Sequence, residues 1–258
     1  MTDVGEWTRA PVGPPSRRER RAREEPARSG PARSRAVRWA LAACAAVVLV
    51  LLGVGAARAA WWTTHPEPEQ PDRVDALLVL YSRPEVYDAA LELIDRGVAE
   101  RVFVSAHLGP DGFQTLCGPE GVRDPRAAKA TVECFAPDPV TTQGEVVHAA
   151  ERMRQLGLEH LGVLTFPQHV ERARILAERC VPADEGTVSM LMFTPRDTSR
   201  RWQLRQDVYG TLAFAKVALT PGCADELPGP VQWPLDVYKR LQGLSTEPDH
   251  QWDPEVRP

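Results

Sequence analysis

Beyond residue 73, short apolar runs alternate with longer segments in which apolar residues recur at helical spacing. Short apolar runs are typical of strands buried on both faces, and apolar residues three or four apart are typical of helices packed on one side. The pattern predicts strands at 74–80, 100–106, 160–166 and 187–193, and helices at 84–97, 140–157, 167–180 and 202–219. Because strands alternate with helices, we expect an α/β domain over residues 74–222, with a mostly parallel sheet covered on both faces. The stretch 107–139 reads as an irregular insertion, and residues 223–258 as a Pro-rich tail.

An uncharged apolar segment precedes this domain. Residues 39–57 are nineteen residues without a charge, which is about the length that a helix needs to cross a bilayer. A cleaved signal peptide is the alternative, because Ala57-Arg58-Ala59 resembles a small-x-small cleavage site. The apolar region of a signal peptide usually spans only about 7 to 15 residues, so we favour a retained transmembrane anchor.

The two flanks of this segment differ in charge. Residues 1–38 contain ten Arg and five acidic residues among Pro, Ser and Gly, a composition that predicts disorder. Because positive flanks stay in the cytoplasm, we expect a cytoplasmic N-terminus and an extracytoplasmic domain, joined by a Pro- and Glu-rich linker over 58–73. The whole chain carries −4 and residues 1–58 hold eleven Arg and five acidic residues, so residues 59–258 carry −10. Such an acidic domain is a poor binder of nucleic acid.

The cysteines agree with an oxidising compartment. Cys44 lies inside the apolar segment, which leaves an even set of four in the outer domain. Three pairings are possible; proximity favours Cys117–Cys134 and leaves Cys180–Cys223 as the second bridge. A zinc site is the alternative, but no CxxC spacing or nearby His pair supports it.

Four stretches carry a resemblance to a known family. They are "DALLVL", "LIDRGVAERVFVSA", "TTQGEVVHAAERMRQLG" and "VLTFPQHVERARILAERC", which together span roughly residues 72–218. In this order they resemble the YdcF/SanA/ElyC-like family of bacterial proteins. The resemblance implies a three-layer Rossmann-like domain, anchored in the bacterial plasma membrane and connected with peptidoglycan or lipid-carrier metabolism in the envelope.

Ligands of parallel α/β sheets bind beyond the carboxyl ends of the strands, which selects the start of the helix at 140–157. Thr142 and Glu145 fit a capping box, a structural arrangement that would occupy both side chains. In the functional alternative, the same helix start, with Thr141 and Gln143, offers backbone amides to an anion, and Glu145 acts as an acid or base.

The segment "LTFPQHVERAR" at 164–174 supplies a second candidate helix start. His169 is either a polar first-turn residue facing solvent or a group that exchanges a proton with a ligand. Arg172 lies about one turn further along the same face, where a guanidinium can bind a phosphate or carboxylate bidentately. We assign Arg174 to surface ion pairing with Glu171 or Glu178.

These observations leave two main functional hypotheses. In the first, the domain binds, and hydrolyses or transfers, a phosphorylated, anionic or lipid-linked small molecule. In the second, it is a non-enzymatic envelope module; a nucleotide- or S-adenosylmethionine-dependent enzyme rests on fold analogy alone. The spacing of acidic and His residues fits no metal-ligand pattern, and no cofactor is expected. The candidate catalytic residues are His169 and Glu145, and the candidate ligand-binding residues are Arg172, Thr141, Thr142, Gln143, Arg83, Ser105, Thr165 and Gln168.

Overall fold

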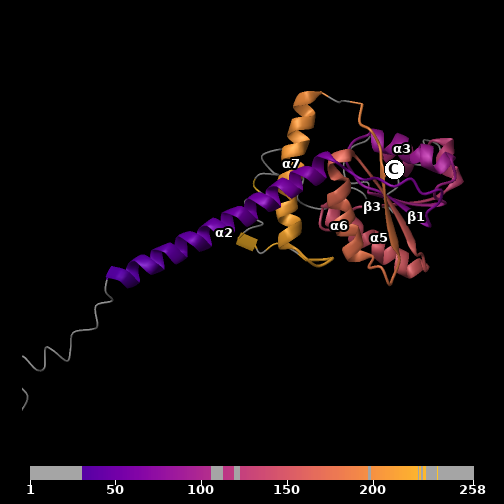
Figure 1. Cartoon of the computed structure of the whole chain (residues 1–258). Helices are drawn as coiled ribbons and strands as arrows, with labels where there is room; N and C mark the ends of the chain where they lie inside the picture. Colours follow the sequence, from indigo (N-terminus) through magenta and orange to yellow (C-terminus); the bar gives the residue numbers. More distant parts are fainter. Residues whose placement is uncertain are drawn as a thin grey trace, which may run out of the picture. The chain divides into compact units, whose positions relative to one another are not determined.

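The computed structural model describes residues 31–105, 113–118, 123–196 and 199–225, together with 227, 229, 230 and 237 (Figure 1). Two compact units divide the chain, at residues 1–53 and 54–258. Residues 1–30, most of the predicted tail, and part of the stretch 107–139 lie outside the described residues. The α/β domain described below belongs to the second unit, whereas the helix α2 has residues in both.

The predicted apolar anchor is one long helix, α2, over Pro31–Thr64. Residues 35–64 of this helix are long and apolar enough to cross a membrane, and none of their most apolar window is buried. Exposed apolar side chains are unfavourable in water, so the segment is suited to lipid. The helix includes residues 31–38, which we predicted as disordered, and residues 58–64, which we predicted as linker.

The α/β domain is built on a five-stranded sheet in which every strand pair is parallel. Its order is β3-β2-β1-β4-β5, with β1 at the centre. The strands are β1 (Ala76–Val79), β2 (Arg101–Ser105), β3 (Thr131–Phe135), β4 (His160–Thr165) and β5 (Thr187–Met192). The four predicted strands are present, and the predicted α/β, Rossmann-like class is confirmed.

Helices cover both faces of the sheet (Figure 1). The helix α3 (Glu85–Asp95) packs on the face that contains Leu77 and Val79. The helices α5 (Thr142–Leu156) and α6 (Val170–Cys180) pack on the face of Leu78 and Leu80. Because side chains alternate along a strand, β1 contributes to both cores, which explains why it reads as a continuous apolar run.

The strand β3 is the element that our sequence analysis missed. It lies within the stretch predicted as irregular and pairs with β2 along its full length, from Arg101–Thr131 to Ser105–Phe135. The strand lies at the edge of the sheet, and only Phe135 of its five residues is buried. Because edge strands carry a weaker apolar signal than central strands, the alternation in this segment did not stand out.

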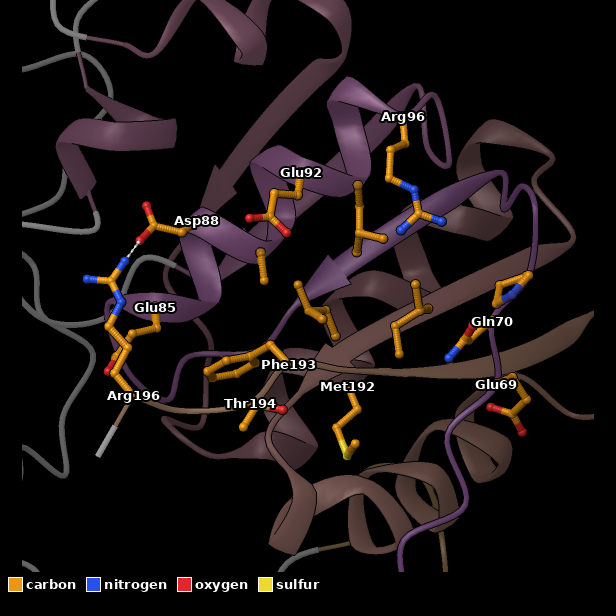
Figure 2. Close-up of a pocket in the computed structure, with 15 residues that line it drawn as sticks. Glu69, Gln70, Glu85, Asp88, Glu92, Arg96, Met192, Phe193, Thr194 and Arg196 are labelled. Atoms are coloured by element: carbon orange, nitrogen blue, oxygen red, sulfur yellow. Dashed lines mark hydrogen bonds and ion pairs between the residues drawn. The ribbon is translucent and has the colours of Figure 1, made fainter. Parts of the chain in front are cut away.

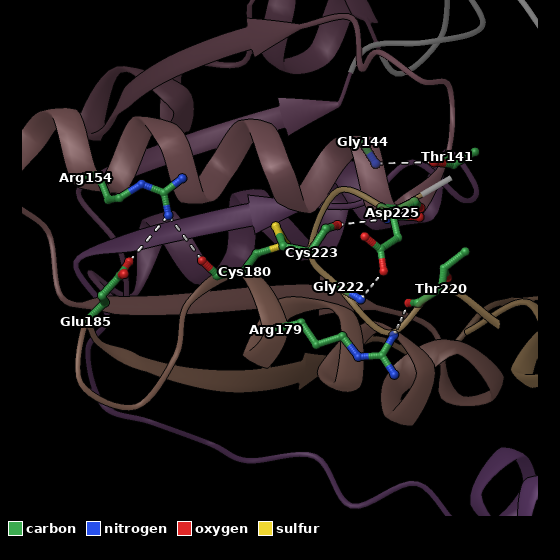
Figure 3. Close-up of a disulfide and its surroundings, with 11 residues drawn as sticks. Thr141, Gly144, Arg154, Arg179, Cys180, Glu185, Thr220, Gly222, Cys223 and Asp225 are labelled. Atoms are coloured by element: carbon green, nitrogen blue, oxygen red, sulfur yellow. Dashed lines mark hydrogen bonds and ion pairs between the residues drawn. A yellow bond between two sulfur atoms is a disulfide. The ribbon is translucent and has the colours of Figure 1, made fainter. Parts of the chain in front are cut away.

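Both predicted disulfides are present. Cys117 joins Cys134 of β3, and Cys180 at the end of α6 joins Cys223 (Figure 3). The first bridge ties the insertion to the edge strand. The second ties the C-terminal segment to the helical layer, where Arg179 also donates to the Thr220 carbonyl at 2.7 Å.

Turn and cap residues set where the remaining elements begin. Asp75 accepts from the Glu159 and His160 backbone amides at 3.0 and 2.9 Å, so it joins the amino ends of β1 and β4. Gly157, with φ +65°, ends α5 in the left-handed conformation that glycine tolerates best. The last helix, α7 (Arg200–Leu219), packs against α6 and the 3-10 turn η3 (Pro167–His169).

The second disulfide gives the first testable prediction. A Cys180→Ser, Cys223→Ser variant of the full chain in detergent should unfold at a lower denaturant concentration, because the bridge spans 43 residues and its loss releases unfolded-state entropy worth about 4 kcal/mol. The measurement is denaturant unfolding followed by circular dichroism. The matched control is Cys44→Ser, which removes a free cysteine. Equal midpoints for the two variants would show that the bridge does not constrain the domain.

Candidate functional site

The topology brings the ends of β1 and β4 together with the start of α5. The chain leaves β1 toward β2 on one face of the sheet and reaches β4 through α5 on the other face. This change of direction between β1 and β4 is the switch point at which ligands of such sheets usually bind. The candidate residues that follow β1, begin α5 and follow β4 all lie at this end of the sheet: Arg83, Thr141, Thr142, Gln143, Glu145, Thr165, Gln168 and His169.

Glu145 is the most buried charged group of this region. Glu145 is 4 % exposed, and one of its carboxylate oxygens accepts a hydrogen bond from the Tyr81 backbone amide at 2.8 Å. Burial raises the pKa of Glu145 to about 7. The Ser105 hydroxyl, the Tyr81 amide and the Arg172 charge act in the opposite direction but do not restore the usual pKa. At neutral pH this carboxyl group is therefore partly protonated, as a proton-transfer group requires.

The predicted capping box at Thr142 and Glu145 is wrong. The N-cap of α5 is Thr141, whose hydroxyl accepts from the Gly144 backbone amide at 3.2 Å (Figure 3). Glu145 turns instead to the end of β1, where it accepts from the Tyr81 backbone amide. The Pro139 carbonyl packs directly on the first turn of α5, at Gly144. A Cβ at Gly144 would lie 2.0 Å from that carbonyl oxygen, so only glycine fits there.

Gln143 has a structural role in the same turn. Its side-chain amide donates to the carbonyls of Cys223 and Asp225, at 2.8 and 2.7 Å. The side chain thereby holds the segment after the second disulfide against the start of α5. This use of its amide protons makes Gln143 a weaker ligand-binding candidate than its position suggested.

His169 is buried rather than turned to solvent. It is 3 % exposed, and both ring nitrogens are engaged: Nδ1 with the Thr165 hydroxyl at 2.8 Å and Nε2 with the Thr142 hydroxyl at 3.1 Å. Burial, and then the positive charge of Arg172, lower the pKa of His169 well below its usual value. The ring is therefore neutral at physiological pH and links the end of β4 to the start of α5.

Arg172 lies on the first turn of α6, beside His169. Its guanidinium lies 5.6 Å from the centre of the Tyr209 ring on α7, and its Nε has no hydrogen-bonding partner among the described residues. Burial lowers the pKa of Arg172, whereas Tyr209 and Glu145 act to hold its charge. A guanidinium keeps its proton in proteins, so this is a fixed positive charge beside a carboxyl group that titrates near neutrality.

Several other polar atoms at the same strand ends are buried and unpaired. Ser105 is 0 % exposed, and its hydroxyl makes no hydrogen bond of ordinary geometry, although it is close enough to stabilise the Glu145 carboxylate. Ser82 Oγ and Gln168 Oε1 are also buried and have no hydrogen-bond partner within the described part of the chain. Buried polar atoms usually have a partner, so these three atoms at the ends of β1, β2 and β4, together with Arg172 Nε, indicate a polar site suited to water or a ligand.

Arg83 and Arg174 are occupied by other contacts. Arg83 pairs with Glu85 at 3.2 Å and lies over the Trp202 ring, 5.2 Å from its centre. Arg174 pairs with Glu171 at 3.1 Å, as expected, and also with Glu69. Neither arginine is available to a ligand in the way that Arg172 is.

Two tyrosines of the site escaped sequence reasoning. Tyr87 lies on the buried face of α3, and its hydroxyl donates to the Ser105 carbonyl at 3.4 Å. Burial first, and then the nearby Tyr81 and Glu145, raise the pKa of Tyr87. Tyr209 contacts Arg172 from α7. Each tyrosine fits the ordinary apolar and polar pattern of its helix, so the sequence does not distinguish it from a core or surface residue without a role in the site.

A cavity of about 440 Å³ lies elsewhere, on the α3 face of the sheet (Figure 2). It is lined by α3, by β5 and the residues after it, and by the segment around Glu69, and none of the predicted site residues lines it. Asp88 and Arg196 pair across its rim at 2.8 Å, and Glu85 also lies on the rim, paired with Arg83. The acidic face of α3 reads in sequence as an ordinary solvated helix surface, so the cavity was not predicted.

Searches against protein-family models, characterised proteins and solved structures return no match for this chain. The resemblance to YdcF/SanA/ElyC-like proteins therefore stays a prediction from sequence motifs. The site is defined by geometry alone: Glu145, Arg172 and Ser105 as polar groups at one end of the sheet, with His169 as a buried link between its parts.

The raised pKa of Glu145 predicts an unusual pH dependence of stability. A carboxyl group with a folded pKa near 7 and an ordinary pKa of 4.5 favours the folded state when protonated, so stability is lost as the pH rises from about 4.5 to 7. The change is on the order of 3 kcal/mol. Denaturant unfolding of the full chain in detergent, from pH 4 to pH 9, should show this loss in the wild type.

The control for this experiment separates Glu145 from other carboxylates. Glu145→Gln keeps an oxygen that can accept from the Tyr81 amide, and it should flatten the stability profile between pH 5 and pH 7.5. Glu151→Gln changes an exposed residue of the same helix and should leave the profile unchanged. A profile of the same shape in all three proteins would contradict a pKa near 7 for Glu145.

Proposed function

We propose that this protein is a membrane-anchored, extracytoplasmic YdcF-like protein of the bacterial envelope that binds a phosphorylated or otherwise anionic group of a small or lipid-linked molecule. The observation that carries the proposal is the meeting of Arg172, Ser105 and Glu145 at the switch point of the sheet. Arg172 supplies a positive charge with an unpaired Nε, and Ser105 a buried hydroxyl that lies beside Glu145 without a hydrogen bond of ordinary geometry. Both groups are donors that phosphate and carboxylate oxygens accept from.

The apolar helix and the disulfides support the cellular location. The helix could span a membrane once, and both bridges are of the kind that persists in oxidising compartments. The excess of arginine before the apolar segment favours a cytoplasmic N-terminus. The domain would then face the compartment in which peptidoglycan precursors and their lipid carriers are processed.

Glu145 would supply the chemistry if the site is catalytic. With a pKa of about 7, its carboxylate form would accept a proton from a water molecule that attacks a phosphorus atom. Arg172 would neutralise charge on the phosphoryl oxygens while the bond from phosphorus to the leaving oxygen breaks. The proton held by Glu145 would then pass to the leaving group. His169, with both nitrogens engaged, would position Thr142 and Thr165.

A non-enzymatic binding module is the second candidate, and the state of His169 favours it. His169, which we predicted as a possible group for proton exchange with a ligand, is neutral, buried and hydrogen-bonded through both ring nitrogens. A site without an available histidine retains Arg172 and Ser105, which suffice to bind an anion. Binding and turnover therefore need separate tests.

The binding test compares two arginines of α6. Arg172→Gln should weaken binding of inorganic pyrophosphate, or of a polyprenyl diphosphate in nanodiscs, by roughly 10- to 100-fold, the effect of losing a charge-assisted hydrogen bond. Arg174→Gln removes the same charge two residues away, where the side chain is paired with Glu171, and should leave affinity unchanged. Isothermal titration calorimetry with the full chain measures both.

The outcomes distinguish the hypotheses. Equal affinities of wild type and Arg172→Gln, or no binding of either probe by the wild type, would contradict an anion site at Arg172. Binding accompanied by release of phosphate that Glu145→Gln abolishes would support the catalytic form. Binding without phosphate release would support the non-enzymatic form.

A further inference from the structure

Two groups of opposite charge meet at the candidate site without forming an ion pair. Glu145 is 4 % exposed, and the Nε of Arg172 is buried without a hydrogen-bonding partner among the described residues. Burial has the largest effect on the pKa of each group, but each also acts on the other: the Arg172 charge lowers the pKa of Glu145, and the Glu145 carboxylate raises that of Arg172. No ion pair joins the two groups in the described part of the chain, where the paired arginine of α6 is Arg174 instead. An anion that binds Arg172 therefore comes close to the Glu145 carboxyl group.

The Glu145 carboxyl group is held in place but retains capacity for a further hydrogen bond. One of its oxygens accepts from the Tyr81 backbone amide at 2.8 Å, and the Ser105 hydroxyl lies beside the carboxyl group. A carboxylate has about four lone-pair sites on its two oxygens. These two neighbours leave lone pairs unused, so the carboxylate can also accept a hydrogen bond from a ligand.

The charge of Glu145 limits which anions fit beside Arg172. A carboxylate and a ligand oxyanion repel each other when both are ionised, and burial strengthens the repulsion. A proton shared between their oxygens removes this repulsion and forms a charge-assisted hydrogen bond. A ligand that carries a proton supplies it whatever the state of Glu145. A ligand without a proton binds only when Glu145 itself is protonated.

We propose that the candidate site selects oxyanions that carry a proton over oxyanions that carry none, with Glu145 as the acceptor of that proton. Hydrogen phosphate and the terminal phosphoryl group of a phosphate monoester or diphosphate belong to the first class. Sulfate and phosphodiesters belong to the second. This selectivity rests on the anion site of the proposed function, and it narrows the ligand to a molecule that ends in a phosphoryl group.

Glu145 is the group whose protonation sets this selectivity near neutral pH. The other ionisable side chains around it come from the end of β1, from α3, from η3 and α6, and from α7: Tyr81, Tyr87, His169, Arg172 and Tyr209. Burial raises the pKa of Tyr81 and Tyr87, so both stay protonated, and it lowers the pKa of His169, so that ring stays neutral. Arg172 keeps its proton, and Tyr209 contacts Arg172.

The test compares inorganic phosphate with sulfate as ligands of the full chain in detergent, at pH 6 and at pH 8.5. Both are tetrahedral oxyanions, but at pH 8.5 hydrogen phosphate keeps one proton and sulfate has none. Burial raises the pKa of Glu145 to about 7, so sulfate should bind more weakly as the pH rises past that value. The ratio of phosphate affinity to sulfate affinity, measured by isothermal titration calorimetry, should therefore rise roughly 10- to 30-fold between the two pH values.

Two variants assign the effect to Glu145. Glu145→Gln replaces the carboxyl group by an amide that does not titrate, so its affinity ratio should be the same at both pH values. Glu151→Gln changes an exposed carboxylate of the same helix and should reproduce the wild-type rise. Circular dichroism checks that both variants are folded, and the rise in the wild type is required whether or not the Glu145 variant folds.

The outcomes separate the selectivity from the anion site itself. A constant ratio in the wild type, or an equal rise in Glu145→Gln, would overturn the proposed selectivity and leave the anion site intact. If neither anion binds at either pH, the anion site of the proposed function is wrong, and the selectivity with it.

Discussion

The hydrogen bond from the Tyr81 backbone amide to the Glu145 carboxylate joins the end of the central strand to the first turn of α5. Burying a carboxylate is costly, and one amide offsets only part of that cost, which is why the pKa of Glu145 rises to about 7. The same burial makes the interaction possible, because water does not compete for the oxygen. The buried position of Glu145 at the end of β1 therefore sets both the geometry and the protonation of the candidate site.

The surroundings of Glu145 are held by contacts from three directions. Gly144 lets the Pro139 carbonyl close on the helix start, and Gln143 binds the carbonyls that follow the Cys180–Cys223 bridge. From the other side, His169 connects Thr142 to Thr165. The first turn of α5 is therefore fixed to the sheet, to α6 and to the C-terminal segment, an arrangement suited to keeping polar groups in place around a ligand.

The features of the fold that could be predicted from sequence are those that depend on neighbouring residues in the chain. Buried strands such as β1 and β4 are continuous apolar runs, and Gly157 ends α5 because few other residues adopt its backbone conformation. The four outer cysteines pair in the predicted way, because sequence proximity selects Cys117–Cys134 and leaves one further bridge. The edge strand β3 escaped prediction because exposed strands need less apolar sequence.

The candidate site shows which contacts cannot be predicted from sequence. Sequence placed Glu145, His169 and Arg172 at the correct end of the sheet, since the order of strands and helices fixes which loops meet there. It did not reveal that Glu145 reaches the Tyr81 amide rather than its own helix cap, or that both nitrogens of His169 are taken. The Glu145–Tyr81 contact joins residues 64 positions apart, and the His169–Thr142 contact joins residues 27 positions apart, so neither follows from local sequence.

Sequence by itself thus determined the long apolar helix, the α/β class, the disulfides and the end of the sheet at which the candidate polar residues lie, because each depends on composition or on the order of elements. Only the tertiary structure decided which polar atoms are paired, how far the pKa of Glu145 is displaced, and which side of α7 is left exposed. Leu204 and Phe214 are equally apolar residues of one helix, and only packing against α2 and α6 distinguishes the buried one from the exposed one. Burial is a property of the partners that the fold brings together, and a residue's own identity does not specify those partners.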